Sequence, residues 1–250
     1  MEASPFDLGP GLTPVHETGR PSLPSSGSTS SAGLERPPTT KTGTTTLAIA
    51  CPDGVVMASE RRATMGHLIG HKATQKIFPV DGHLAITTAG LVGDAQMLAR
   101  VLQAQAQLYR FKRDGPLPVR GAATLLGNIL NQSRYQPFWV QLIVGGHDAT
   151  GGSIYSVDAA GGAIPEKWTV TGSGSPFVYG VLEDRLGEDV PAREAVDLAI
   201  RGLNAAMRRD SASGNGMDIA LIDAQGFRRL DNAEVVKRHK ALRLPMSFND

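Results

Sequence analysis

Residues 44–60 read TTTLAIACPDGVVMASE and predict the first two elements of the fold. The first half of this stretch, residues 44–51, predicts a β-strand, and its second half, residues 55–60, predicts a strand that returns beside it. The Pro-Asp-Gly turn at 52–54 is typical of a tight antiparallel hairpin. Folded structure is therefore expected to begin abruptly at Thr44, on antiparallel β-strands.

Further along, apolar residues recur at the spacing of amphipathic helices in residues 94–113 and 118–134. Proline at the first position favours two more helices, at 176–186 and 191–209. The other predicted elements are strands at 76–80, 83–88, 138–144, 153–157, 168–171, 217–222 and 227–230, and a short helix from Asn232. Groups of strands that alternate with pairs of helices predict an α+β fold. In it, two antiparallel sheets stack face to face between helix layers, as a four-layer αββα sandwich.

Residues 1–43 differ in composition from the rest of the chain. Ser, Pro, Gly and Thr supply 26 of these 43 positions, and seven of the 16 prolines of the chain fall here. Such a segment cannot bury enough apolar surface to offset the entropy lost on ordering, so we expect it to be disordered. It also lacks the apolar core of a secretion signal. It is either a tail without a role or a propeptide that is removed.

Composition argues against several classes of function. Lys and Arg number 25 against 24 Asp and Glu, a balance that does not indicate nucleic-acid binding. No apolar run reaches the ~18 residues of a membrane span. Cys51 is the single cysteine, so no internal disulfide can form and a reducing cytoplasm is the expected location. His67 and His71 stand four apart but lack a nearby third ligand, so they predict exposed loop histidines and no metal site; no cofactor is expected.

Familiar motifs for a nucleophile or a phosphate are absent from the sequence. It has no G-x-S-x-G elbow, no G-x-x-x-x-G-K-[ST] loop and no G-x-G-x-x-G fingerprint. Instead, Gly43 stands directly before a strand that begins with Thr44. Glycine permits backbone conformations that are closed to other residues. That freedom matters if the Thr44 hydroxyl must turn back onto the Gly43 carbonyl and cut the chain there.

A threonine freed at its amino end combines two chemical roles. Its α-amine has a reference pKa of about 7.7–8.0, close to neutral pH, so it can act as a base. Its γ-methyl group restricts χ1 and can hold the hydroxyl in one direction. A lysine used as the base would need its pKa lowered by roughly three units. On pattern alone, however, the Gly-Thr-Thr-Thr run is also consistent with the ordinary start of a β-strand.

From Thr44 to about Leu230, the chain resembles the β-subunits of the proteasome, archaeal members in particular. The matching blocks are GTTT at 43–46, SERRATM at 59–65, HKATQK at 71–76, AGLVGDA at 89–95, DAAGG at 158–162, TGSGSPFVYG at 171–180 and RDSASG at 209–214. The resemblance implies the fold of the N-terminal-nucleophile hydrolases and the activity of a threonine endopeptidase, the catalytic β-subunit of a 20S core particle. Residues 1–43 then become a propeptide that is removed by self-cleavage between Gly43 and Thr44, and residues 44–250 the catalytic domain.

The resemblance also implies a role for each matching position. Thr44 is the nucleophile, and its freed amine is the general base. The positive charge of Lys76 favours the alkoxide, Glu60 pairs with Lys76, and the N–H of Gly90 forms the oxyanion hole. The residues expected to support the amine and a water are Ser173, Asp210, Ser211 and Ser213. Taken singly, the lysine and glutamate also fit an ordinary strand ion pair, and Asp210 also fits a helix cap.

By the same resemblance, the side chain before the cut bond enters a pocket. The expected lining residues are Ala63, Thr74, Phe78, Thr88, Val92 and Gln96. Thr64 offers its backbone to an extended peptide, which binds as an added strand. Since Thr88 at the pocket base carries no charge, we expect cleavage after apolar residues in preference to charged ones.

The family further implies a large assembly. Seven β-subunits form a ring, two such rings meet face to face, and α-subunit rings gate the ends of a 28-subunit core that receives polypeptides from a regulatory ATPase ring. One alternative is a threonine peptidase of the HslV type, with hexameric rings, against which the SPFVYG and RDSASG blocks argue. Another is a non-catalytic β-subunit that keeps its leader, although such subunits usually lose the threonine or the lysine. An α-type gating subunit is disfavoured, because the leader lacks the additional N-terminal helix of those subunits.

Overall fold

The computed structural model describes residues 43–245 of the 250-residue chain. The leader predicted to be disordered therefore lies outside the described residues, except for Gly43. Within residues 43–245, the predicted strands and helices are all present in the predicted order. They build two five-stranded antiparallel sheets and a separate two-stranded hairpin.

The first sheet contains the strand that follows Gly43. Its strand order is β10 (Trp168–Gly172), β1 (Thr45–Cys51), β2 (Gly54–Glu60), β11 (Met217–Asp223) and β12 (Gly226–Arg229). β1 and β2 form the predicted hairpin, with Leu47 opposite Ala58. On its other side β1 pairs with β10, with Thr46 opposite Thr171. β1 is thus an interior strand, which agrees with the burial of nearly all its side chains.

The second sheet packs against the first through an apolar cluster between them. Its strand order is β5 (Ile77–Asp81), β6 (Leu84–Gly90), β7 (Val140–Asp148), β8 (Gly151–Val157) and β9 (Ala163–Glu166). β5 and β6 form the second predicted hairpin. The sheet ends at β5 on one side and at β9 on the other, so both of these are edge strands.

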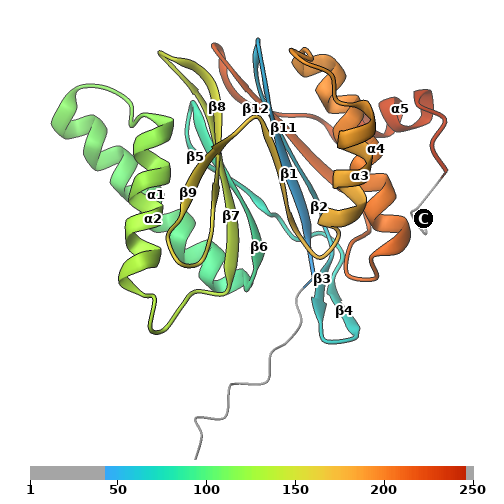
Figure 1. Cartoon of the computed structure of the whole chain (residues 1–250), viewed down its shortest axis with the longest axis horizontal. Helices are drawn as coiled ribbons and strands as arrows, with labels where there is room; N and C mark the ends of the chain where they lie inside the picture. The colour runs from blue at the N-terminus through green and yellow to red at the C-terminus, as the bar shows by residue number, and fades with distance from the viewer. Residues whose placement is uncertain (1–42, 246–250) are drawn as a thin grey trace, which may run out of the picture. The chain divides into compact units, whose positions relative to one another are not determined.

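Helices cover the outer face of each sheet (Figure 1). α1 (Val92–Arg113) and α2 (Val119–Gln132) lie against the second sheet, whereas α3 (Ser175–Arg185), α4 (Ala192–Arg209) and α5 (Asn232–Ala241) lie against the first. The arrangement is the predicted four-layer αββα sandwich.

Three apolar clusters hold the four layers together. One joins α3, α4 and α5 to the first sheet, and a second joins α1 and α2 to the second sheet. The third lies between the sheets and includes Ala48, Met57 and Ile143. Full burial of a leucine or isoleucine side chain contributes about 1.5–3 kcal/mol. The three clusters therefore supply the main stabilisation of the layered fold.

The local sequence of α4 explains the position of Asp210, which directly follows the helix. Pro191 precedes the first turn, where its fixed φ angle and missing N–H are well tolerated. Buried Ala195, Ala199 and Leu203 then recur at helical spacing and face the first sheet. The helix ends at Arg209, and the next residue, Asp210, has an extended backbone. Asp210 therefore stands at the point where the chain leaves the helix.

Two features of the structure differ from the sequence-based expectation. Ala63–Met65 (β3) and Leu68–His71 (β4) form a hairpin where loop histidines were predicted, so that prediction was wrong for His71, which ends a strand. β9 was not predicted either. Most side chains of β4 and β9 are exposed, so neither strand shows the alternation of buried and exposed residues that marks a strand in sequence. Pro165 in β9 is tolerated because β9 is an edge strand.

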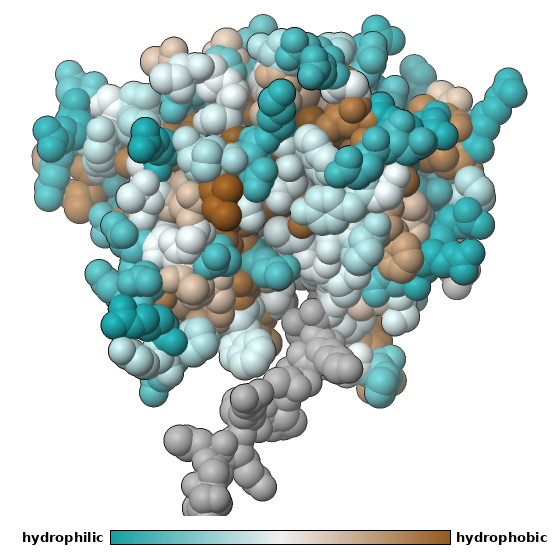
Figure 2. All heavy atoms as spheres, in the orientation of Figure 1, coloured by the Kyte–Doolittle hydropathy of each residue, from teal (hydrophilic) through white to brown (hydrophobic). Residues whose placement is uncertain are grey.

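Hydrophobic residues on the surface lie in small groups among hydrophilic ones on the face shown in Figure 2. The most exposed large apolar side chains include Phe111 in the last turn of α1, Tyr135 in the turn after α2, and Leu68 in β4. No helix in the described part of the chain is long and apolar enough to cross a membrane.

Candidate active site

Four strand ends, from the hairpins β1–β2 and β5–β6, meet at one end of the two sheets. β1 starts directly after Thr44 and β2 ends at Glu60, while β5 starts directly after Lys76 and β6 ends at Gly90. A cavity of about 300 Å³ lies at this end. The predicted nucleophile, lysine and oxyanion glycine all line it.

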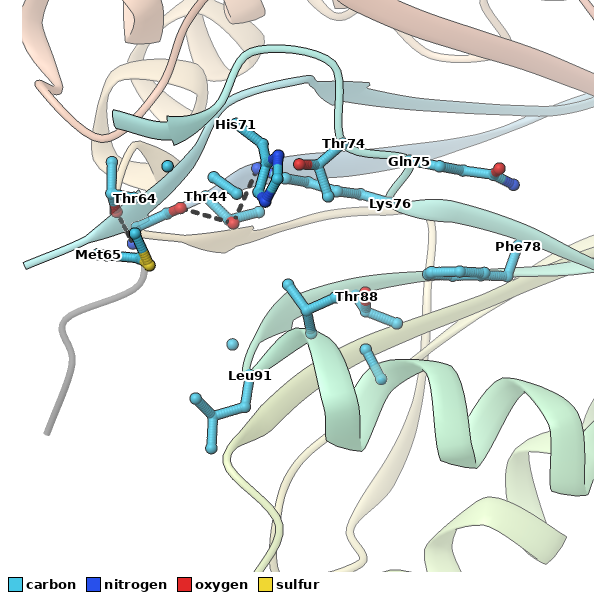
Figure 3. Close-up of a pocket in the computed structure, with 16 residues that line it drawn as sticks. Thr44, Thr64, Met65, His71, Thr74, Gln75, Lys76, Phe78, Thr88 and Leu91 are labelled. Carbon is cyan, nitrogen blue, oxygen red and sulfur yellow. Dashed lines mark hydrogen bonds between the residues drawn. The ribbon is translucent and has the colours of Figure 1, made fainter. Parts of the chain in front are cut away.

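The hydroxyl group of Thr44 lies between a carbonyl oxygen and an amine (Figure 3). Thr44 is only 4 % exposed. Its Oγ1 donates a hydrogen bond to the carbonyl oxygen of Gly43 at 2.7 Å and accepts one from Nζ of Lys76 at 3.0 Å. The hydroxyl therefore lies against the peptide bond at which the sequence predicts cleavage.

Lys76 is held by a buried carboxylate. Its Nζ forms an ion pair with Oε1 of Glu60 and donates to the carbonyl of Arg62 at 2.6 Å. The carboxylate of Glu60 also accepts from the backbone N–H groups of Thr45, Arg62 and Gly214, at 3.2, 2.6 and 3.1 Å. Glu60 is 0 % exposed, so the pair is not the surface ion pair of the alternative interpretation.

Burial shifts the pKa of both members of this pair toward their neutral forms. It lowers the pKa of Lys76 below its ordinary value, because a charged ammonium group loses hydration in the interior. It raises the pKa of the Glu60 carboxyl for the same reason. The contact between the two side chains opposes both shifts. At a given pH, the fraction of Lys76 in the neutral amine form is therefore larger than that of an exposed lysine.

A chain of hydroxyls connects the backbone of Thr44 to Asp210. The N–H of Thr44 donates to Oγ of Ser173 at 3.2 Å, and Ser173 Oγ donates to Oδ2 of Asp210 at 2.6 Å. Ser213 Oγ donates to the same oxygen at 2.6 Å. Because the Ser213 proton is used there, the contact of 2.6 Å between Ser213 Oγ and Thr45 Oγ1 has the Thr45 hydroxyl as its donor. One carboxylate thus orients both serines.

Ser211 lies in this loop but contributes through its backbone. It is exposed, and its carbonyl accepts a hydrogen bond of 2.7 Å from Nη1 of Arg62. Nε of Arg62 also donates to Oδ1 of Asn215 at 2.9 Å. Arg62 therefore ties the loop after α4 to the segment beside Lys76. No role was assigned to Arg62 from the sequence. Its position two residues after Glu60 was the one feature in sequence that placed it near the site.

Two glycines are required by close backbone packing. A Cβ atom on Gly43 would overlap the Cβ of Ala212 and come within 2.9 Å of Ser173 Oγ. The N–H of Gly43 donates to Oγ1 of Thr64 at 3.1 Å, which fixes the residue further. Gly90 has a φ angle of +128°, and a Cβ there would overlap the carbonyl oxygen of Trp139. Neither position admits a side chain without a backbone shift.

The structure brings most of the predicted pocket residues together. Ala63, Thr64, Thr74, Phe78, Thr88 and Val92 all line the cavity. Gln96 does not; it is exposed on α1, and the buried Ala95 lines the cavity instead. Sequence reasoning missed the lining residues of the β3–β4 hairpin, Met65, Gly70 and His71, because it did not predict that hairpin. No group of three or more His, Cys, Asp or Glu that could hold a metal ion occurs within residues 43–245.

The chain is similar to known proteins over most of its length. The proteasome subunit family matches residues 40–222. A proteasome β-subunit of Methanothermobacter thermautotrophicus is 53% identical over 197 residues, which are 78% of this chain and 94% of the relative. Those of Methanosarcina mazei and Archaeoglobus fulgidus are 49% and 52% identical, over 80% and 77% of this chain and 96% and 91% of the relatives.

The match extends over most of the described residues and over nearly the full length of these relatives. It covers all the strands and helices that bring Thr44, Glu60, Lys76, Gly90 and Asp210 together. The chain therefore belongs to the proteasome subunit family, as a catalytic β-subunit of archaeal type in the 20S core particle, a threonine peptidase that assembles with α- and β-subunits.

Proposed function

We propose that the chain is made as a precursor that cuts itself between Gly43 and Thr44, leaving residues 44–250 as the mature subunit. The observation that carries this proposal is the 2.7 Å contact between the Thr44 hydroxyl and the Gly43 carbonyl, beside Nζ of Lys76. The mature subunit then cleaves polypeptides with Thr44 as its nucleophile.

The first step needs a base other than the nitrogen of Thr44. In the uncut chain that nitrogen belongs to a peptide bond and cannot accept a proton. Nζ of Lys76 lies 3.0 Å from the hydroxyl, and burial lowers its pKa, which increases the fraction of neutral amine. Neutral Lys76 takes the hydroxyl proton as Oγ1 attacks the Gly43 carbonyl carbon.

The attack converts the peptide bond to an ester and then to two free ends. The C–N bond between Gly43 and Thr44 breaks, the nitrogen takes the proton that Lys76 had accepted and becomes an amine, and Gly43 is held as an ester on Oγ1. Water then attacks the ester carbon and one of its protons restores the hydroxyl of Thr44. Gly43 is left with a carboxylate, and the second proton of the water passes to solvent. The products are the leader, residues 1–43, and a chain with a free N-terminal threonine.

The new amine then serves in the cleavage of other polypeptides. Its reference pKa of about 7.7–8.0 suits a base at neutral pH. Its nitrogen lies beside Ser173, which Asp210 orients, so the hydroxyl proton can pass to it through a water. The charge of Lys76 favours the alkoxide, and the N–H of Gly90 is assigned to the oxyanion that forms on the substrate carbonyl.

The cavity favours apolar side chains before the cut bond. Its walls include Ala63, Phe78, Val92 and Ala95, and the nearby Thr88 is uncharged. We expect faster hydrolysis of fluorogenic peptides after Leu, Phe or Tyr than after Arg or Glu. The reverse order would contradict this assignment of the pocket.

The proposed assembly is a ring of seven β-subunits, stacked face to face with a second ring and capped by α-subunit rings, in the cytoplasm. A regulatory ATPase ring is proposed to supply unfolded polypeptides. Ring counting by electron microscopy tests the stoichiometry, since six subunits per ring would indicate the HslV type.

N-terminal sequencing of the assembled particle tests the self-cleavage directly. The wild-type chain should begin Thr-Thr-Thr-Leu, whereas Thr44→Ala should retain its leader and hydrolyse no peptide. A Thr44→Ser variant is the matched control, because it keeps the hydroxyl group and should still be cut, although more slowly without the γ-methyl that holds χ1. Retention of the leader by an active wild-type particle would refute the proposal.

A further inference from the structure

Three buried threonine hydroxyls meet between the two sheets, beside the site but outside its cavity. Oγ1 of Thr46 on β1 lies 2.8 Å from Oγ1 of Thr87 on β6 and 2.8 Å from Oγ1 of Thr171 on β10. Thr46 and Thr87 are 0 % exposed and Thr171 is 7 % exposed. These three residues are named the threonine cluster below.

Each member of the threonine cluster lies within three residues of a group in the candidate site. Thr46 lies in β1, two residues after the proposed nucleophile Thr44, which directly precedes that strand. Thr87 precedes the oxyanion glycine, Gly90, by three residues on β6. Thr171 precedes Ser173 by two residues, at the end of β10. The cluster therefore joins β1, β6 and β10, the strands next to Thr44, Gly90 and Ser173.

The surrounding contact between the sheets cannot fix their relative position to the same degree. It is made of apolar residues such as Ala48, Ala85 and Ile143, and apolar packing is not directional. Hydrogen bonds are directional and weaken steeply when they bend. The two bonds of Thr46, one within its sheet and one across to the other, thus define where the nucleophile lies relative to Gly90.

We propose that the threonine cluster is a positioning device for the reaction, which sets the Thr44 hydroxyl against the carbonyl that it attacks. The inference rests on the proposed role of Thr44 as nucleophile. The three residues touch neither substrate nor reacting atoms, and they act through their strands. Because a displacement of about 1 Å in a site can cost 10²-fold in rate, loss of the hydroxyl contacts should lower kcat.

A neighbouring serine provides a matched control. Ser59 lies opposite Thr46 in the β1–β2 register and is 0 % exposed, like Thr46. Among the described residues, its Oγ is the buried side-chain atom that has no hydrogen-bond partner. Ser59→Ala therefore removes a hydroxyl group that is as buried as that of Thr46 and lies opposite it in the sheet, but that forms no hydrogen bond.

The experiment compares Thr46→Val, Thr46→Ser, the triple variant Thr46→Val/Thr87→Val/Thr171→Val and Ser59→Ala in assembled particles. Valine keeps the shape and removes the hydroxyl, while serine keeps the hydroxyl and removes a methyl group. The measured quantities are kcat and KM for a fluorogenic peptide, the fraction of chains with the leader removed, and Tm. Wild type and Thr44→Ala are included in the same series.

Thr46→Val and the triple variant should lose about tenfold or more in kcat, with KM unchanged and leader removal slowed. Thr46→Ser should keep more activity than Thr46→Val, and Ser59→Ala should match wild type. The triple variant leaves no hydroxyl of the cluster unpaired, so its Tm should be closer to that of wild type than the Tm of Thr46→Val. Across the variants, kcat would then depend on the presence of the hydroxyl groups and would not follow Tm.

Two results would overturn the inference. One is a triple valine variant with wild-type kcat, and the other is equal loss of kcat in Thr46→Val and Thr46→Ser. If Thr46→Val fails to assemble, Thr87→Val with Thr87→Ser as its partner gives the same comparison from the other sheet. Failure of the underlying function looks different, because then wild type keeps its leader or Thr44→Ala remains active.

Discussion

The two halves of the first strand region, residues 44–46 and 47–51, are equally buried but serve different purposes. The first half is three threonines, whose hydroxyls contact Lys76, Ser213 and Thr87. The second half, from Leu47 to Cys51, packs its side chains into apolar clusters. A buried polar group is costly unless it has a partner, and here each hydroxyl has one from a different segment. The two halves therefore differ in what they bring together, because the polar half connects residues of the candidate site and the apolar half packs into the core.

The largest effect should come from the partner of the first threonine. Lys76→Ala removes the proposed base of self-cleavage, so we expect a loss of about 10²–10⁴-fold in the rate of leader removal. Lys76→Arg should fail similarly, since arginine stays charged and accepts no proton. Intact mass of the particle over time measures the rate. Lys72→Ala, at an exposed lysine nearby, is the control and should be processed like wild type.

Gly43→Ala should come next, with leader removal slowed by roughly 10²-fold. A Cβ there overlaps Ala212, so the carbonyl must move away from the Thr44 hydroxyl. The same mass measurement follows the reaction. Gly82→Ala is the matched control, because a Cβ at Gly82 meets no atom within 4 Å. Processing of Gly43→Ala at the wild-type rate would show that the fit of Gly43 is not required.

A smaller, graded effect is expected from pH. In the proposed reaction neutral Lys76 is the reactive form, so the rate of leader removal should rise as pH rises, by roughly tenfold per unit below the lysine pKa. It should level off once the pH passes that pKa. Burial lowers the pKa of Lys76, so the plateau should begin below the ordinary value of 10.5. Mass spectra of samples quenched at successive times, across a pH series, measure the rate of leader removal. A rate that does not depend on pH would argue against lysine as the base.

The apolar half of the strand should give the opposite pattern. Leu47→Ala creates a cavity between the first sheet and its helices, and it should cost about 2–5 kcal/mol in the free energy of unfolding. The kcat of particles that do assemble should stay within about twofold of wild type, because Leu47 contacts no reacting group. Urea unfolding of the isolated subunit and peptide kinetics of the particle measure the two quantities. A large drop in kcat at unchanged stability would break the division between the two halves.

Much of the fold was predictable because its buried elements carry clear signals, which are helical spacing in the helices and apolar, strand-forming runs around turns in the strands. The helical spacing in α4 and the paired strands β1 and β2 were both visible in sequence. The exposed hairpin of β3 and β4 and the edge strand β9 were not, since few of their side chains are buried. Periodicity reports burial, and it is silent where an element has two exposed faces.

The site was predictable as a set of residue types, but its contacts were not. Ser173 and Asp210 meet across 37 positions of sequence, through the end of β10 and the end of α4. The resemblance predicted Gln96 in the pocket wall, whereas Ala95 lies there. Successive residues of an α-helix point about 100° apart, so an error of one position along α1 turns the side chain away from the cavity. Arg62 was missed because its role depends on a loop 149 residues away.

Gly43 has one further consequence, since it lines the same cavity that would receive a substrate. While it remains attached to Thr44, another peptide cannot take its position against the hydroxyl. The single cut that liberates the terminal amine would also vacate that position. Activation and admission of foreign chains would then coincide, and a subunit that has not yet processed itself would be harmless to its surroundings.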